Sequence, residues 1–255
     1  MIVFNADLDN TLIYSYKHKI GNEKKDVELY NGRNISFASK KTLRLLREIK
    51  KEILIVPTTT RTIEQYKRIN LDIGKLQYAL VCNGGILLKN GEVEQEWYQD
   101  SLKLISESNQ VIEDGISFLR NDLRRDFEVR HIENLFVFTK CREPEEVVVE
   151  LKRKLDLSFV DVFNNGIKVY IVPKTLTKGA AIKRFKEYID AGIVIAAGDS
   201  EFDLTMFDVA DVSYAPMELK DRISNTQKIH IAETEELFSE FLLKSINDKL
   251  IKREI

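Results

Sequence analysis

Two aspartates and a threonine follow the first apolar segment of the chain. Residues 2–4 are apolar and predict a short buried strand, after which Asp7, Asp9 and Thr11 occur two positions apart. Alternate side chains of an extended segment point the same way, so Asp7 and Asp9 are expected to face one site. Two neighbouring carboxylates repel each other, and a hard cation or a shared proton would offset the repulsion. One aspartate could then attack phosphorus while its neighbour donates a proton. For so short a motif, an acidic turn without chemistry is the alternative.

Three later segments add residues that suit phosphate or metal binding. Residues 53–61 read ILIVPTTTR, a hydrophobic strand that ends in hydroxyls near the start of a helix, where a phosphate oxygen binds well. Residues 177–182 read TKGAAI and place a lysine at a helix start; beside the nucleophile, its cation would offset negative charge in a transition state. Residues 197–207 read AGDSEFDLTMF, an acidic loop after an apolar strand.

These four segments, in this order, resemble the motifs of the haloacid dehalogenase superfamily of phosphohydrolases. The resemblance spans nearly the whole chain. It implies an α/β fold with a doubly wound parallel-sheet, Rossmann-like core. An insert of different rhythm between the second and third motifs, entered through residues 83–85 (NGG), resembles the α+β cap of the C2-capped branch, whose members include Cof-like and sucrose-phosphatase-like proteins.

The resemblance also implies roles for individual residues. Asp7 would be the nucleophile and Asp9 the general acid and base, and Mg²⁺ is the implied cofactor. The predicted catalytic residues are Asp7, Asp9, Thr59 and Lys178; the substrate-binding residues are Thr59, Thr60, Arg61, Asn83, Gly84 and Lys178; the metal ligands are Asp7, Asp9 through its carbonyl, Asp199 and Asp203.

Some of these positions leave alternatives open. Thr58, Thr59 and Thr60 compete for the phosphate, and the Thr-Gly-Arg pattern common in the branch selects Thr59 but has glycine where this chain has Thr60. Asp203 is either a ligand or a carboxylate behind the metal. Phe202 stands where the branch often carries asparagine, which puts an amide contact at that position in doubt.

Strand and helix signals alternate at both ends of the chain. Strands are expected at residues 2–4, 53–56, 78–81, 193–197 and 212–214, and helices after Ser36 or Ser39, at 62–69 and at 235–250. Because helices separate the strands, we expect a parallel sheet whose carboxyl edge gathers Asp7, Thr59 and Asp199.

The middle of the chain has a different rhythm and predicts an α+β insert. A hairpin turns at Asn90-Gly91, a helix covers about 102–123, and a second helix opens at Pro144. Strands are expected at 127–130, 135–139, 159–163 and 167–172. The predicted division is a catalytic core of 1–84 and 173–255 and a cap of 85–172 that selects the substrate. Candidate contacts in the cap are Trp97, Arg130, His131 and Lys168, among which the sequence does not choose.

Composition bounds the remaining possibilities. With 255 residues and 44% hydrophobic residues, the chain can bury a sizeable core. A net charge of −2 argues against a nucleic-acid partner. Cys82 and Cys141 form no ligand cluster, and Cys82 is expected to be buried. Without a leader-like or membrane-length apolar segment, we expect a cytoplasmic protein with no membrane partner, a monomer or small homo-oligomer.

The sequence therefore predicts a magnesium-dependent phosphatase. Its substrate would be a small phosphorylated metabolite such as a sugar phosphate, hydrolysed through an aspartyl-phosphate intermediate. Two alternatives remain: a phosphomutase with the same aspartates, and a catalytically idle module that binds phosphorylated metabolites.

Overall fold

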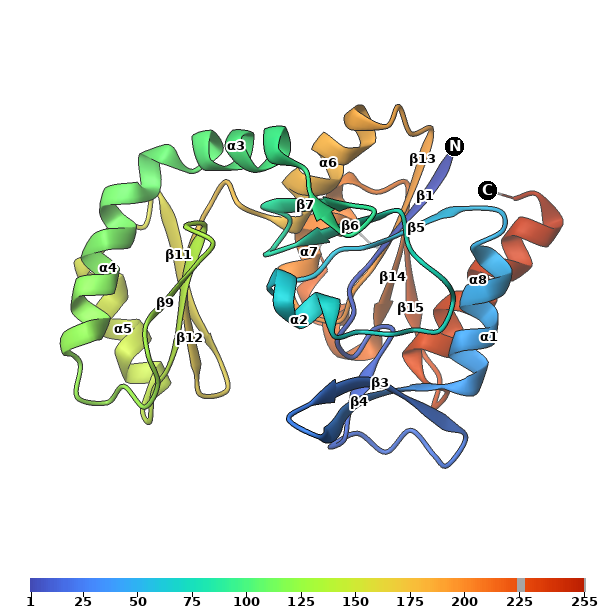
Figure 1. Ribbon diagram of the computed structural model, residues 1–255, viewed down its shortest axis with the longest axis horizontal. Coiled ribbons are helices and arrows are strands. Elements are labelled where there is room, and N and C mark those ends of the chain that lie inside the picture. Colours follow the sequence, from blue (N-terminus) through green and yellow to red (C-terminus); the bar gives the residue numbers. More distant parts are fainter. Residues whose placement is uncertain (224–227, 255) are drawn as a thin grey trace. The chain divides into compact units, whose positions relative to one another are not determined.

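The computed structural model describes residues 1–223 and 228–254 and divides the chain into two compact units (Figure 1). The core unit consists of Met1–Val93 and Lys178–Ile255, and the insert unit is Glu94–Thr177. The insert unit begins later than expected from the sequence, because the hairpin that turns at Asn90-Gly91 belongs to the core unit, and it ends at Thr177 instead of residue 172. The division of labour between a catalytic core and a substrate-selecting cap stays a prediction.

The core unit is built on a parallel sheet of five strands in the order β15-β14-β13-β1-β5. These strands are β1 (Ile2–Ala6), β5 (Leu54–Pro57), β13 (Ile193–Ala197), β14 (Val212–Pro216) and β15 (Ile229–Ala232). The chain runs from β1 to β5 on one side and later returns to β13 on the other side of β1. In doubly wound sheets, ligands bind beyond the carboxyl ends of the strands at such a reversal. The fold class expected from the sequence is confirmed.

Helices cover both faces of this sheet. In Figure 1, α1 (Lys40–Ile49) and α8 (Phe238–Lys252) lie on one side, and α6 (Lys178–Tyr188) and α7 (Leu204–Val209) on the other. The first pair contributes its apolar stripes to the core: Leu43, Leu46, Ile49, Leu242, Leu243 and Ile246. Each such side chain contributes about 1.5–3 kcal/mol when it leaves water, so the 3.6-residue spacing of the stripes is what holds these helices on the sheet.

Two antiparallel sheets complete the core unit. The order β2-β4-β3 joins β2 (Tyr14–Ser15), β3 (Lys24–Tyr30) and β4 (Arg33–Ser39), three strands that were not expected from the sequence. The second sheet joins β6 (Tyr78–Val81), β7 (Ile86–Lys89) and β8 (Glu92–Val93). Strand 78–81 was expected in the parallel sheet, and this was wrong. Its ladder partner is β7, while a parallel bridge from Leu80 to Thr58 and a hydrogen bond from the Thr59 N–H to the Leu80 oxygen (2.8 Å) link it to the residues after β5.

The insert unit is a four-stranded antiparallel sheet, ordered β11-β12-β10-β9, with two helices on one face (Figure 1). Its strands are β9 (Arg130–Ile132), β10 (Phe136–Lys140), β11 (Val160–Asn165) and β12 (Lys168–Pro173), and its covering helices are α4 (Asn109–Asn121) and α5 (Pro144–Lys154). Val137, Val162, Val169 and Ile171 of the sheet pack against Ile116 and Leu151 of the helices.

Among the described residues, no helix is both long and apolar enough to cross a bilayer.

The single helix expected over 102–123 is in fact two helices. The first is α3 (Gln95–Leu104), and a short 3₁₀ turn, Ser106–Ser108, separates it from α4. Ser106 Oγ donates to the Lys103 oxygen at 2.8 Å, and Ser108 Oγ to the Phe159 oxygen at 3.1 Å. Serine side chains that bind backbone oxygens in this way compete with a continuous helix, which explains the break.

We expect Ser39→Ala to lower the free energy of unfolding by about 1–2 kcal/mol. Ser39 is the N-cap of α1, where its side chain accepts from the Thr42 N–H at 2.9 Å and donates to Glu240 at 2.6 Å. Chemical denaturation measures the change. The control is Ser117→Ala, an exposed serine of α4 that is expected to change stability by less than about 0.5 kcal/mol. Equal effects of the two substitutions would contradict the capping role.

Candidate active site

The register of three neighbouring strands brings the predicted motifs to one edge of the sheet. Ala6, the last residue of β1, pairs with Ala197 of β13 and Pro57 of β5. The ladder continues one residue further, because the Asp7 N–H donates to the Ala197 oxygen and the Thr58 N–H to the Ala6 oxygen, both at 2.8 Å. The residues that follow β1, β5 and β13 therefore leave the sheet side by side.

Lys178, the first residue of α6, is buried at this edge between two carboxylates. Its Nζ donates to Asp7 Oδ1 at 2.8 Å and to Asp203 Oδ1 at 2.5 Å. The Lys178 side chain is 1% exposed. Burial alone would lower the pKa of Lys178, but the charges of Asp203 and Asp7 outweigh burial and raise that pKa above its ordinary value. The ammonium is therefore held in its charged form beside Asp7.

Asp203 fastens the loop that follows β13. Its Oδ2 accepts from the N–H groups of Asp199 (3.0 Å) and Ser200 (2.9 Å) and from the Ser200 hydroxyl (2.7 Å). A Cβ on Gly198 would lie 2.3 Å from Cβ and Cγ of Asp203, so only glycine permits this approach. Both oxygens of Asp203 are thus occupied, which favours the alternative of a carboxylate behind the metal; direct ligation by Asp203 stays a prediction. Phe202 is half-buried beside it, and these contacts form without an amide at that position.

Three carboxylates gather where this loop meets the end of β1. Asp7, Asp199 and Asp203 each place an oxygen within 4.8 Å of the other two. Burial, followed by the charge of Asp203, raises the pKa of Asp199 to about 6. Burial also raises the pKa of Asp7 well above its ordinary value, with Lys178 opposing it. One ammonium does not balance this charge. Clustered carboxylate oxygens are the donors that a hard divalent cation takes, so Asp7 and Asp199 suit Mg²⁺.

The residues of the first motif orient Asp199. Asn10 Nδ2 donates to Asp199 Oδ2 at 3.1 Å, and Thr11 Oγ1 donates to Asp199 Oδ1 at 3.2 Å. Asn10 adopts a left-handed backbone with φ of 55°, a conformation that asparagine tolerates better than most residues. These two hydrogen bonds link the residues that follow β1 to the loop that follows β13. The predicted ligation by the Asp9 carbonyl stays a prediction.

The Asp9 carboxylate is held by Arg61. Arg61 Nε and Nη2 donate to Oδ2 and Oδ1 of Asp9, both at 2.7 Å. On its other side, Arg61 contacts the buried Glu28 through Nη1 at 2.9 Å and Nη2 at 3.0 Å. Burial would lower the pKa of Arg61, but hydrogen bonds to Asp9 and Glu28 raise it overall. The sequence predicts Arg61 as a substrate-binding residue; in the structure its guanidinium faces two carboxylates.

The three threonines after β5 have different surroundings. Thr58 Oγ1 accepts from Asn5 at 3.0 Å and donates to the Val56 oxygen at 3.2 Å, so Thr58 serves the sheet. Thr59 is buried, and its Oγ1 accepts from the Arg61 N–H at 3.2 Å. Thr60 is half-buried. This arrangement agrees with the choice of Thr59, whose contact with phosphate stays a prediction along with that of Thr60.

A strained turn packs against the same loop. Cys82, Asn83 and Gly84 follow β6 with φ values of 53°, 58° and 86°. The N–H groups of Cys82 and Asn83 donate to the oxygens of Arg61 (2.8 Å) and Thr59 (3.0 Å). Left-handed backbone costs a residue other than glycine about 1–3 kcal/mol and persists where surrounding contacts hold it. The structure therefore brings the predicted Asn83 and Gly84 to the threonine loop. Cys82 is buried, as expected.

The residues proposed as substrate contacts in the cap all lie in the insert unit. Trp97 is buried, Arg130 donates to Glu128 at 2.5 Å, and His131 Nδ1 lies 3.9 Å from Glu113. These contacts leave the choice among them open, as the sequence did; Lys168 is exposed.

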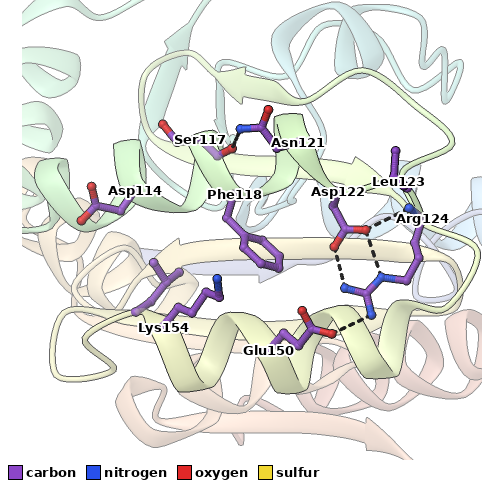
Figure 2. A pocket seen from close by; sticks show the side chains of 10 residues that line it. Asp114, Ser117, Phe118, Asn121, Asp122, Leu123, Arg124, Glu150 and Lys154 are labelled. Atoms are coloured by element: carbon purple, nitrogen blue, oxygen red, sulfur yellow. Dashed lines mark hydrogen bonds and ion pairs between the residues drawn. The ribbon is translucent and has the colours of Figure 1, made fainter.

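A shallow groove of about 770 Å³ lies between α4 and α5 of the insert unit. Figure 2 shows the side chains that line it. Its Arg124 is paired with Asp122 at 2.7 Å and Glu150 at 2.9 Å, and Lys154 lies over the Phe118 ring at 5.0 Å. The groove contains none of the predicted site residues, and the charge of its Arg124 is balanced by two carboxylates within it. It does not compete with the sheet edge as a candidate active site.

A family model for haloacid dehalogenase-like hydrolases matches residues 94–236. The match covers more than half of the chain and includes Lys178, Asp199 and Asp203. The chain belongs to the haloacid dehalogenase-like hydrolase family. The resemblance inferred from the order of four motifs is thereby confirmed.

Two curated relatives of this haloacid dehalogenase-like hydrolase are phosphoglycolate phosphatases. The protein from Sulfurisphaera tokodaii is 31% identical over 103 residues, which cover 39% of this chain and 46% of the relative. The protein from Picrophilus torridus is 26% identical over 157 residues, which cover 61% of this chain and 62% of the relative. The chain thus spans about half to three-fifths of the length of these relatives.

A solved structure shares the whole fold. The sucrose-phosphatase of Synechocystis sp., determined with sucrose and phosphate, aligns with a TM-score of 0.66 at 15% identity and covers 97% of this chain and 98% of its own. At this identity the likeness concerns the fold alone. It supports a haloacid dehalogenase-like core combined with an α+β cap.

Two residues of this site were not singled out from the sequence. Asn10 lies inside the first motif. The available signal was its residue type, because asparagine favours turns and tolerates a left-handed backbone. Glu28 lies in β3, and the hairpin signal Asn31-Gly32 would have predicted that strand. No signal in the sequence indicated that Glu28 points inward.

We expect Gly198→Ala to destabilise the core unit by about 1–3 kcal/mol, since an inserted methyl group must displace Asp203. Thermal and chemical unfolding measure the loss. Gly192→Ala is the matched control, because the nearest atom to its added Cβ would lie at 3.6 Å, an ordinary contact. If both variants unfold like the wild-type protein, the close approach of Asp203 to Gly198 is not what shapes the loop.

Proposed function

We propose that the protein is a magnesium-dependent phosphatase that hydrolyses a small phosphorylated metabolite through an aspartyl-phosphate intermediate. The observation that carries the proposal is the buried Asp7 at the end of β1, held by Lys178 and flanked by Asp199 and Asp203. A carboxylate fixed at the reversal of a doubly wound sheet is placed to act as a nucleophile. The phosphatase names of the relatives support the same reaction.

In the first step Asp7 attacks the phosphorus atom of the ester. The bond from Asp7 to phosphorus forms as the bond to the leaving oxygen breaks, and Asp9 gives that oxygen its proton. Lys178, already beside Asp7, offsets the negative charge that the phosphoryl group brings. The Thr59 hydroxyl and the neighbouring N–H groups would bind the phosphoryl oxygens.

In the second step water attacks the aspartyl phosphate. Asp9 takes a proton from the water, the bond between Asp7 and phosphorus breaks, and inorganic phosphate leaves. Asp7 and Asp9 then return to their starting states. When bound to Asp7 and Asp199, Mg²⁺ would neutralise charge on the phosphoryl group and on the carboxylates.

The substrate is proposed as a small alkyl phosphate. A sugar phosphate is suggested by the fold shared with a sucrose-phosphatase, and phosphoglycolate by the names of the two relatives. Phosphate release from 2-phosphoglycolate, sucrose 6-phosphate and glucose 6-phosphate tests the reaction and ranks these substrates. Isomerised sugar phosphate without released phosphate would instead reveal a phosphomutase, and binding without turnover an idle module.

Replacing the nucleophile gives the first activity prediction. Asp7→Asn keeps the shape of the side chain but removes the attacking charge, so phosphate release should fall by several orders of magnitude. The rate is measured with 4-nitrophenyl phosphate and circular dichroism checks the fold. Asp208→Asn makes the same change at an exposed position of α7 and should leave the rate unaltered. A folded Asp7→Asn protein with near-normal turnover would rule out this nucleophile.

The second activity prediction concerns the cation. Chelation should abolish phosphate release, and added Mg²⁺ should restore it; the larger Ca²⁺ should bind but support turnover poorly. Asp199→Asn removes one carboxylate ligand, so half-maximal activity should require at least about tenfold more Mg²⁺. Full activity after exhaustive chelation, or a preference for Zn²⁺, would contradict the proposed metal.

A further inference from the structure

Glu28 is a charged residue buried by an irregularity in its strand. In β3 the neighbours Val27 and Glu28 are both buried, although successive side chains of a regular strand point to opposite faces. The register of β3 against β4 shifts at this point: Asp26 pairs with Phe37 and Glu28 with Ser36, so Val27 is extra. A bulge of this kind re-aims a side chain. Here it turns the Glu28 carboxylate into the unit, where its exposure is 0%.

The buried carboxylate has three partners. Ser36 Oγ donates to Oε2 at 2.6 Å, and the guanidinium groups of Arg61 and Arg68 approach Oε1 at 2.9 Å and 3.0 Å. Burying a single ion costs several kcal/mol unless hydrogen-bonded partners surround it. Two arginines and a hydroxyl meet that need, so Glu28 is fixed in place.

Arg61 links the fixed Glu28 carboxylate to Asp9. It grips Glu28 with Nη1 and Nη2 and Asp9 with Nε and Nη2, so its planar donor fork is anchored at both ends. Side-chain exposure rises along these contacts, from 0% for Glu28 to 12% for Arg61 and 49% for Asp9. Asp9, the half-exposed member, is therefore oriented by a chain of contacts that begins in the protein interior.

We propose that Glu28 is a positioning residue for proton transfer by Asp9, acting through the Arg61 guanidinium. The inference rests on the proposed phosphatase function and adds a residue from outside the four motifs. With glutamine at position 28, one anchor of Arg61 loses its charge. The guanidinium can then move together with Asp9, whose carboxyl group no longer has a fixed direction toward the leaving oxygen.

The prediction is a change in leaving-group dependence. An alkoxide needs a proton as it leaves, whereas 4-nitrophenolate does not. General acid catalysis contributes about 10²–10⁴ in rate, and misplacing the group forfeits part of it. Because Asp9 also serves the later attack of water, which is the same for both substrates, the quantity compared is kcat/KM, which covers only the steps up to the aspartyl phosphate. We expect Glu28→Gln to lower kcat/KM about tenfold or more on the alkyl phosphate of the panel above that the wild-type protein hydrolyses fastest. On 4-nitrophenyl phosphate we expect less than about a threefold loss.

Two further variants test the route. Arg61→Lys keeps the positive charge but lacks the fork, and should show the same selective loss on the alkyl phosphate. If Glu28 acts only through Arg61, the double variant should resemble Arg61→Lys alone rather than combine the two losses. Glu240→Gln is the matched control: this carboxylate also binds a hydroxyl and a lysine, at 2.6 Å and 3.1 Å, but its rate ratio should not change.

The outcomes are separable. Equal losses on both substrates, or no loss in folded Glu28→Gln protein, would overturn the positioning role while leaving the phosphatase intact. Additive losses in the double variant would overturn the route through Arg61. If Glu28→Gln does not fold, Glu28→Asp replaces it: the charge remains, the carboxylate recedes by one methylene, and the same selective loss is expected. A wild-type protein that releases no phosphate from any substrate would refute the proposed function itself.

Discussion

The rest of the active site depends on the burial of Lys178 between Asp7 and Asp203. An ammonium without water around it is stable only where carboxylates surround it, and two buried carboxylates need a cation between them. This mutual requirement ties β1, α6 and the loop after β13 at one point. Removing either kind of partner would leave an uncompensated charge in the interior. Such a loss typically costs about 3–5 kcal/mol, a large share of the stability of a domain.

Close packing around this ion cluster restricts the backbone as well. Gly198 lets Asp203 approach the end of β13, and Gly179 lets the first turn of α6 reach α7. A Cβ on Gly179 would lie 2.1 Å from the Thr205 oxygen. Both glycines lie next to predicted site residues, so the space for a methyl group is missing where the charges must meet. Their role is steric, since neither has a positive φ.

The features predicted well from the sequence were those set by local chemistry. Apolar runs marked the strands that precede Asp7, Thr58 and Asp199, and Ser39, one of the two serines expected before a helix, caps α1. The failures had two different causes. Strand 78–81 pairs with its neighbour in the chain, β7, instead of joining the parallel sheet. The helix break at Ser106–Ser108 includes a contact between Ser108 and Phe159, which is distant in the sequence.

It was harder to predict how the site residues are oriented than which residues belong to the site. Arg61 was recognised by its place in a motif. Its partner Glu28 points inward because of a bulge in β3, and no alternation of apolar and polar residues in the sequence reveals that bulge. Lysine is ordinarily a surface residue; the motif suggested that Lys178 lies beside the nucleophile, but its burial was not predicted. Residue type and order therefore predicted which groups assemble, whereas the ion pairs that aim them emerge only in three dimensions.

The discontinuity of the core unit has a consequence for biosynthesis. Asp7 and Lys178 are separated by 171 positions, and Asn10 and Asp199 by 189, whereas the insert unit is one continuous segment. Chains are synthesised from the N-terminus at about 5–20 residues per second, and long loops must close before distant partners can stabilise each other. While the ribosome makes the insert unit, β1 waits with one edge unpaired because β13 does not yet exist. The nascent chain can complete its insert unit first, whereas the carboxylate cluster cannot assemble until synthesis has reached Asp203.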